Sequence, residues 1–240
     1  MQNRIRVLLA MICVIVAACD NRLENNYFPL EKGLSWDYKR SQTIVGQAWP
    51  EVDEFSLRNL GREQINNAAS SHAVFVRRTS DGTDYYLSDT AEGIRRVAKR
   101  TVVETKPRFD SDLRIVLPSK EKLKFGNIWN VESGPYVLHT RPGYSADLSD
   151  NRFKMAFEVI DLEATVDVPA GRFEGCLKIE GYASIRLFAD ARIGFVDVPI
   201  TQTEWYAPGV GMVKLERDEP IDGVFYVGGK VTLELKNFDY

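Results

Sequence analysis

The sequence predicts a mainly β protein made of antiparallel strands, with little helix. Apolar and polar side chains alternate over residues 153–159 and again over residues 231–236, which is the pattern of strands buried on one face. Turn signals built from glycine and proline recur at short intervals after residue 27, including an Asp-Gly pair at residues 81–82. No segment combines helix caps with a 3.6-residue apolar period.

Residues 1–18 predict a lipoprotein signal peptide. Arg4 and Arg6 precede an apolar run over residues 7–16, and alanines follow at positions 17 and 18. A basic start, about ten apolar residues and a small-residue cleavage site are typical of an export signal. The run is shorter than the about 20 residues that a transmembrane helix needs. The alternative is a buried N-terminal segment of the folded domain.

Cys19 ends a Val-Ala-Ala-Cys series that resembles the bacterial lipobox. The resemblance implies cleavage before Cys19 and attachment of lipid, diacylglycerol and palmitate, to this residue. Acyl chains contribute about 0.8 kcal/mol per buried methylene, so two or more hold a protein at a bilayer without a spanning helix. We therefore expect the covalent lipid on Cys19 to anchor the protein to the membrane, and we predict no other cofactor.

Residues 19–26 form the lipidated cysteine and a polar tether. A tether of this length reaches at most about 25 Å, so the domain is expected close to the membrane, on the periplasmic face of the cell envelope. Asp20 and Asn21 follow the cysteine, and an aspartate at that place resembles the signal that retains lipoproteins at the inner membrane. We expect the inner rather than the outer membrane. The alternative is that Asp20 is only a polar tether residue.

Composition favours a single β-rich domain over residues 27–240. The chain has 240 residues, 44% of them hydrophobic, and a formal net charge of −3. All-β domains of about 200–250 residues often form one unit. The mixed charge gives no indication of nucleic-acid binding. With Cys13 removed and Cys19 acylated, Cys176 has no partner for a disulfide, and we interpret it as a small buried residue rather than a reactive thiol.

Two stretches of this domain allow more local predictions. Residues 72–100 are expected to form a meander, with strands over 73–79, 84–88 and 94–100 and a tight turn at the Asp-Gly pair. Residues 110–122 are expected to hold one short helix.

A Leu-x-x-Gly-x-x-Trp pattern occurs twice, with Gly33 and Trp36 in the first copy and Gly126 and Trp129 in the second. Each glycine is expected to turn the chain into a strand, and each tryptophan to pack over that turn, removing roughly 200 Å² from water. The two copies predict either two related half-sheets or the same corner built twice. Chance is the alternative.

Three motifs resemble a group of uncharacterised bacterial envelope lipoproteins: Phe-Pro-Leu-x-x-Gly-x-x-Trp at 28–36, Val-Pro-Ala-Gly-x-Phe at 168–173, and Trp-Tyr-Ala-Pro-Gly-Val-Gly-x-Val-Lys at 205–214. The defining positions of the last two motifs are Pro169, Gly171, Trp205, Pro208, Gly209 and Gly211. This group is distantly similar to half-barrel carriers of the LolA and LppX type. The resemblance implies a single curved antiparallel sheet or half-barrel around an apolar cavity and assigns no activity. We interpret the motifs as specifying the backbone path.

No motif in the sequence points to catalysis or to a metal. His72 and His139 have no metal-ligand spacing, and there is no nucleophile elbow, P-loop or dinucleotide-binding glycine pattern. The oxygen-rich residues 147–151 are interpreted as a solvated turn rather than a calcium site. The basic residues within 95–108 are interpreted as a solvated strand face, with contact to anionic lipid as the alternative.

These observations favour a binding or envelope-assembly module, with an apolar ligand in the concavity of the sheet or an envelope protein on its surface. The first alternative is a structural lipoprotein that acts only through protein contacts. The second is a hydrolase with dispersed catalytic residues. We predict no enzyme activity and no catalytic residue.

Overall fold

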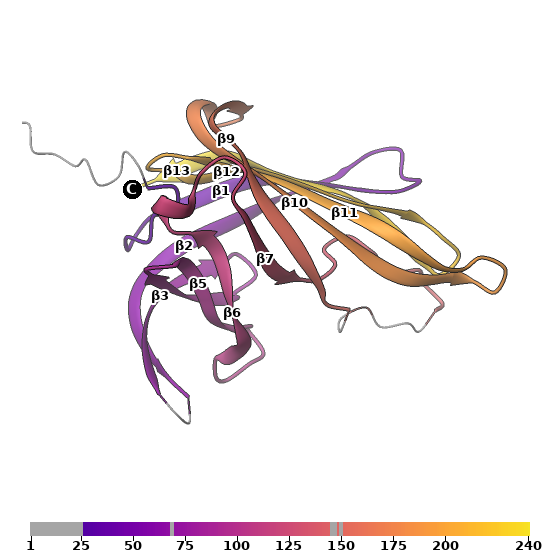
Figure 1. Ribbon diagram of the computed structural model, residues 1–240, viewed down its shortest axis with the longest axis horizontal. Helices are drawn as coiled ribbons and strands as arrows, with labels where there is room; N and C mark the ends of the chain where they lie inside the picture. Colours follow the sequence, from indigo (N-terminus) through magenta and orange to yellow (C-terminus); the bar gives the residue numbers. More distant parts are fainter. Residues whose placement is uncertain (1–25, 68–69, 145–147, 149–150) are drawn as a thin grey trace, which may run out of the picture.

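The computed structural model describes residues 26–67, 70–144, 148 and 151–240, with residues 111–113 described by their backbone alone (Figure 1). The predicted signal peptide, Cys19, Asp20, Asn21 and most of the tether lie outside the described residues, so these assignments stay predictions. In the part that is described, no helix has the length and apolar character needed to cross a bilayer.

Within the described residues thirteen strands join one antiparallel sheet. The strands are β1 Ser35–Ile44, β2 Glu51–Asn66, β3 Ser71–Thr79, β4 Asp84–Thr90, β5 Gly93–Arg100, β6 Arg108–Pro118, β7 Ile128–Ser133, β8 His139–Thr140, β9 Phe153–Val168, β10 Gly171–Asp190, β11 Gly194–Ala207, β12 Gly211–Asp222 and β13 Tyr226–Asp239. Their order is β6-β5-β4-β3-β2-β1-β13-β12-β11-β10-β9-β7, with β8 paired to β13. The first strand therefore lies beside the last, in a register that pairs Ser35 with Asp239.

The predicted fold class is confirmed, because the chain folds as a single curved antiparallel sheet. The predicted meander is also confirmed by β3, β4 and β5. The helix expected over residues 110–122 is wrong, since β6 runs through it and only Lys120–Lys122 forms a 3₁₀ turn. The β-branched residues Ile115 and Val116 favour a strand, and Pro118 ends the strand because it lacks an N–H for the ladder.

Tight turns in this sheet depend on local chemistry. In the β3–β4 turn the Asp81 carboxylate accepts a hydrogen bond from the Thr83 N–H at 2.9 Å, and Gly82 adopts a φ of 83°. A positive φ is readily adopted by glycine because it has no Cβ. The β9–β10 turn contains Pro169 and Gly171, and its Ala170 N–H donates to the Leu235 carbonyl at 2.8 Å.

The curvature brings the two ends of the sheet together. Figure 1 shows strands β2 to β6 curling away from the long strands β9 to β13. One apolar cluster contains Leu87 and Leu117 from β4 and β6 as well as Met155 and Ile200 from β9 and β11. The edge strands β6 and β7 also approach each other, although no ladder joins their described residues. This cluster thus lies inside a curved, incompletely closed wall. A separate cluster, with Val74 and Val76 of β3, packs on the other face of that strand from Phe75.

Candidate functional site

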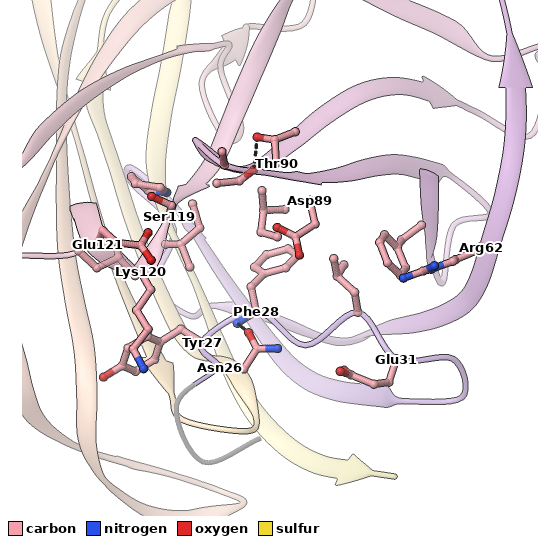
Figure 2. Close-up of a pocket in the computed structure, with 18 of the residues that line it drawn as sticks. Asn26, Tyr27, Phe28, Glu31, Arg62, Asp89, Thr90, Ser119, Lys120 and Glu121 are labelled. Atoms are coloured by element: carbon pink, nitrogen blue, oxygen red, sulfur yellow. Dashed lines mark hydrogen bonds between the residues drawn. The ribbon is translucent and has the colours of Figure 1, made fainter. Parts of the chain in front are cut away.

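A pocket of about 920 Å³ lies where the chain enters the domain, between residues 26–32, the β4–β5 turn and the 3₁₀ turn after β6 (Figure 2). We call this the outer pocket. Its apolar lining is Tyr27, Phe28, Leu30, Phe75, Ile94, Leu117 and Leu123. Figure 2 shows Lys120 and Glu121 on one side and Arg62 and Glu31 on the other. Apolar walls with a few polar groups, enclosing about 300–1,000 Å³, are typical of small-molecule sites.

One wall of the outer pocket is the chain from residue 26 to residue 32, which we call the wall segment. It is not part of a strand, so its position depends on bonds to the sheet. The side-chain amide of Asn59, a residue 2% exposed, donates to the carbonyls of Pro29 and Glu31, both at 3.1 Å. The carbonyl of Asn26 accepts a hydrogen bond from Gly209 N–H at 2.9 Å. The wall segment is thereby fixed against both β2 and the β11–β12 turn.

A second cavity of about 240 Å³, the inner cavity, lies deeper in the concavity of the sheet. Phe28 lines both cavities, so the two lie next to each other at this residue. The inner cavity is lined in part by apolar side chains, among them Leu87 and Ile179. Its charged lining residues are Arg77, Arg96, Arg114 and Glu204.

Arg77 is the most enclosed of these arginines. Its guanidinium donates to Asn59 Oδ1 at 2.9 Å and to the Pro29 carbonyl at 2.7 Å, and it lies over the rings of Phe28 and Trp36 at 4.2 and 4.7 Å. No described carboxylate forms an ion pair with it. Burial lowers its pKa to about 10, which still leaves the group charged at neutral pH.

The other charged groups of the inner cavity differ in their partners. Arg96 forms a two-point ion pair with Asp110, with N–O distances of 2.6 and 2.9 Å. Arg114 forms no hydrogen bond or ion pair with another described residue. Glu204 accepts hydrogen bonds from the Gln202 amide and the Tyr206 hydroxyl. Burial raises the pKa of the Glu204 carboxyl.

A buried polar chain continues from Glu204 into the sheet. Arg217 is fully buried and donates to Gln202 Oε1 at 2.7 Å and to Glu219 Oε1 at 2.6 Å. The Glu219 carboxylate in turn accepts the backbone N–H groups of residues 136–138 at 2.7 to 3.1 Å. Buried charges require such complete hydrogen bonding to be tolerated. This buried polar chain of hydrogen-bonded side chains therefore connects the lining of the inner cavity to the loop that follows β7.

The glycine and tryptophan positions of the repeated pattern occupy turns and buried sites. Gly33 and Gly126 precede β1 and β7 with φ values of 99° and 76°. Trp36 donates from Nε1 to the Val210 carbonyl at 2.7 Å. Trp129 stacks on Phe157 with ring centroids 5.8 Å apart, and its buried Nε1 has no hydrogen-bond partner among the described residues.

The third motif supports the wall segment. Pro208 and Gly209 lie in the β11–β12 turn, and a Cβ at Gly211 would lie 3.3 Å from the Pro29 side chain. Glycine at position 211 therefore leaves space for Pro29 beside the turn. Trp205 is farther from the pocket, with the ammonium groups of Lys178 and Lys214 at 5.6 and 5.4 Å from its ring.

The remaining sequence candidates show no reactive arrangement. Cys176 is fully buried, and burial raises its pKa to about 11. Arg96 and Arg100 of the basic stretch form ion pairs with Asp110 and Asp84 inside the sheet. In the described part of the chain no three His, Cys, Asp or Glu side chains are grouped as metal ligands. Most of the 147–151 loop lies outside the described residues.

Sequence reasoning missed the charged lining of the inner cavity. The signal was present on β11 and β12, where Gln202, Glu204, Arg217 and Glu219 occupy inward positions two residues apart. The alternating pattern places apolar residues at such positions. Four polar residues at inward positions of two paired strands indicate a polar interior. Arg77 and Arg114 have no such neighbouring polar residues, so the sequence around them does not indicate that they line a cavity.

No protein-family model matches the chain, and no curated protein sequence matches it. Among solved structures, a Bacteroides fragilis protein described as exported with a YmcC-like fold has 13% identity and a TM-score of 0.40, covering 89% of this chain and 99% of its own. A Parabacteroides distasonis protein described as a lipoprotein has 17% identity and a TM-score of 0.39, with coverage of 90% and 99%. Neither similarity assigns a function or a site to this chain.

Proposed function

We propose that the protein is a membrane-anchored periplasmic lipoprotein that binds a small molecule with an apolar body in the outer pocket. The single observation that carries the proposal is a pocket of about 920 Å³ whose lining combines apolar and aromatic side chains with polar and charged ones. Burying apolar ligand surface there is favourable by about 25 cal/mol per Å² removed from water. We therefore favour ligand binding over a role limited to protein contacts.

The predicted lipid anchor supports this assignment. Asn26, the last residue of the tether that starts at Cys19, lines the outer pocket, as do Tyr27 and Phe28 directly after it. A tether that reaches at most about 25 Å keeps the mouth of the pocket near the lipid surface. Exchange of an apolar molecule with a bilayer is then short-range. Asp20 and Asn21 favour the inner membrane as the place of attachment.

Filling the mouth of the pocket tests the proposal. Ala91 lines the pocket from the exposed β4–β5 turn, so Ala91→Trp adds bulk without entering the core. We expect the uncharged fluorescent probe N-phenyl-1-naphthylamine to bind the wild-type domain saturably, and Ala91→Trp to weaken that binding at least tenfold. The matched control is Ala170→Trp in the exposed β9–β10 turn, which should leave binding unchanged. Unsaturable binding, or equal binding by all three proteins, would refute the proposal.

A second candidate, docking to an envelope protein, is favoured by the end of the β10–β11 hairpin. Ile193 and Phe195 are 64% and 60% exposed there, and Phe188 packs against Phe195 with ring centroids 5.5 Å apart. Exposed apolar groups gathered at one place often mark contact sites. Crosslinking in cells from position 193 should trap one specific partner, and Phe195→Glu should abolish the trapping. A crosslinking pattern equal to that of an exposed position elsewhere would remove this candidate.

A further inference from the structure

We infer that the inner cavity binds the anionic head group, a carboxylate or a phosphate, of an amphipathic ligand whose apolar body lies in the outer pocket. The inference rests on the proposed function and names the class of ligand. It starts from the charges that line the inner cavity.

Two guanidinium groups face the inner cavity without a carboxylate partner among the described residues. Arg77 has the neutral acceptors Asn59 Oδ1 and the Pro29 carbonyl, and Arg114 has no hydrogen-bond partner there. An arginine side chain stays charged in proteins, and burying such a charge without a counter-ion is unfavourable. Arg96, in contrast, has Asp110. An anion placed between Arg77 and Arg114 would supply the missing partner.

The carboxyl group nearest to these arginines does not take that role. Glu204 is the one carboxyl among the described residues that line the inner cavity. Both of its oxygens accept hydrogen bonds from neighbours on its own strand, Gln202 and Tyr206. Glu204 interacts with Arg114 through space but forms no ion pair with it or with Arg77. Three arginines and one glutamate line the cavity, so its lining has an excess of positive charge that an anionic ligand can balance.

The volumes divide the ligand into two parts. About 240 Å³ accommodates a carboxylate or phosphate with a few attached atoms, given that one water occupies about 30 Å³. A long hydrocarbon chain does not fit there, whereas the outer pocket has about 920 Å³ and several apolar lining residues. Phe28 lines both cavities, and its ring lies against the Arg77 guanidinium. Rotation of this ring would join the cavities and expose the guanidinium to a head group.

Guanidinium chemistry accounts for the choice of anion. Arginine presents planar, paired N–H donors that match the two oxygens of a carboxylate or a phosphate. A neutral alcohol offers a single acceptor oxygen and no charge. The cavity should therefore discriminate between amphiphiles of equal chain length by the charge of the head group.

Calorimetry on the chain from residue 19 onward, carrying Cys19→Ser to keep it in solution, tests the inference. The probes are dodecanoate, dodecyl phosphate, dodecanol and inorganic phosphate, each below its aggregation concentration. We expect the two anionic amphiphiles to bind at least tenfold more tightly than dodecanol. Equal affinity for dodecanol and dodecanoate would overturn the inference and leave the proposed function standing. Binding of none of the amphiphiles would contradict both. Inorganic phosphate binding as tightly as dodecyl phosphate would overturn the amphiphile assignment in favour of a free anion.

Three variants locate the effect. Arg114→Met removes the unpaired charge and keeps the length of the side chain, so it should lower dodecanoate affinity at least tenfold and leave dodecanol affinity unchanged. Glu204→Gln should raise dodecanoate affinity several-fold, because it removes the carboxyl that lines the cavity. Arg58→Met is the matched control, since Arg58 is exposed on β2 and lines neither the outer pocket nor the inner cavity.

The control variant also distinguishes local contact from general attraction. Unchanged dodecanol affinity in each variant shows that the protein is folded with its outer pocket intact. If Arg58→Met lowered dodecanoate affinity as much as Arg114→Met, long-range attraction by positive charge would explain the selectivity and the inner site would be refuted.

Discussion

Replacing Glu219 by glutamine removes one negative charge from the buried polar chain without changing the size of the side chain. The carboxylate is fully buried and receives Arg217 Nε at 2.6 Å on Oε1. On Oε2 it accepts the N–H groups of Val137 and Leu138 at 2.8 and 2.7 Å. A glutamine amide offers one acceptor oxygen and one donor nitrogen, so it cannot accept at both positions.

The size of the expected loss follows from this geometry. If the amide oxygen faces the two backbone N–H groups, its nitrogen faces another donor, Arg217 Nε, and that guanidinium loses its counter-ion. Removing one partner of a buried ion pair costs about 3–5 kcal/mol. The opposite orientation leaves buried backbone donors without an acceptor, at about 1–3 kcal/mol each. We therefore expect Glu219→Gln to lower the free energy of unfolding by about 3–5 kcal/mol, a large share of the about 5–15 kcal/mol that such domains possess.

Urea unfolding followed by tryptophan fluorescence measures this difference, provided that the slope of the transition is the same for both proteins. The matched control is Glu54→Gln, because Glu54 is 71% exposed on the side chain and its pair with Lys236 lies at the surface. Exposed pairs contribute about 1 kcal/mol or less. If Glu219→Gln lost no more stability than Glu54→Gln, the reasoning about the buried chain would be wrong.

Three further outcomes are expected. Burial would raise the pKa of the Asp84 carboxyl, but hydrogen bonds from two arginines outweigh it and lower the pKa below its ordinary value of 3.8. Ionised Asp84 thus stabilises the fold above its unfolded-state pKa, and this contribution is lost as pH falls through the folded-state pKa. Asp84→Asn should therefore lower the free energy of unfolding at pH 7 and change it little near pH 2, as measured by urea unfolding at the two pH values. Gly229→Ala should prevent correct β1–β13 pairing, because the added Cβ would clash with the Thr43 carbonyl oxygen; a wild-type circular dichroism melting curve would contradict this. Cys19→Ser should move the protein from the detergent phase to the aqueous phase in a detergent partition, and a variant that stayed with detergent would exclude the lipid anchor.

The fold class could be predicted because apolar alternation and turn residues are local signals. Residues 153–159 alternate in sequence as they do in β9, and the Asp-Gly pair forms the turn between β3 and β4. The strand β6 was missed because residues 110–122 show no clear period of either kind. Its assignment depends on pairing with β5, which brings Ile94 opposite Leu117. Such a tertiary contact overrides weak local preference.

The site was harder to predict than the fold. The sequence shows polar residues at inward positions of β11 and β12, but it does not show which residues their side chains contact. Arg217 meets Gln202 through the register of two strands, and Glu219 meets a loop about 80 residues earlier in the chain. The contact between Arg77 and Phe28 depends on a wall segment with no regular secondary structure. These contacts are set by sheet curvature, which no periodic pattern encodes.

The pairing of β1 with β13 joins the first strand of the sheet to the last. Strands β1 to β6 pair with neighbours in sequence and can assemble as they are synthesised, whereas the second edge of β1 has no partner until the end of the chain is made. Pairing between such distant segments slows folding, and an unpaired edge is open to wrong partners. The wall segment likewise has no support from Gly209 until most of the chain exists. The sheet and the support of the wall segment are therefore complete only in molecules whose whole chain has been synthesised.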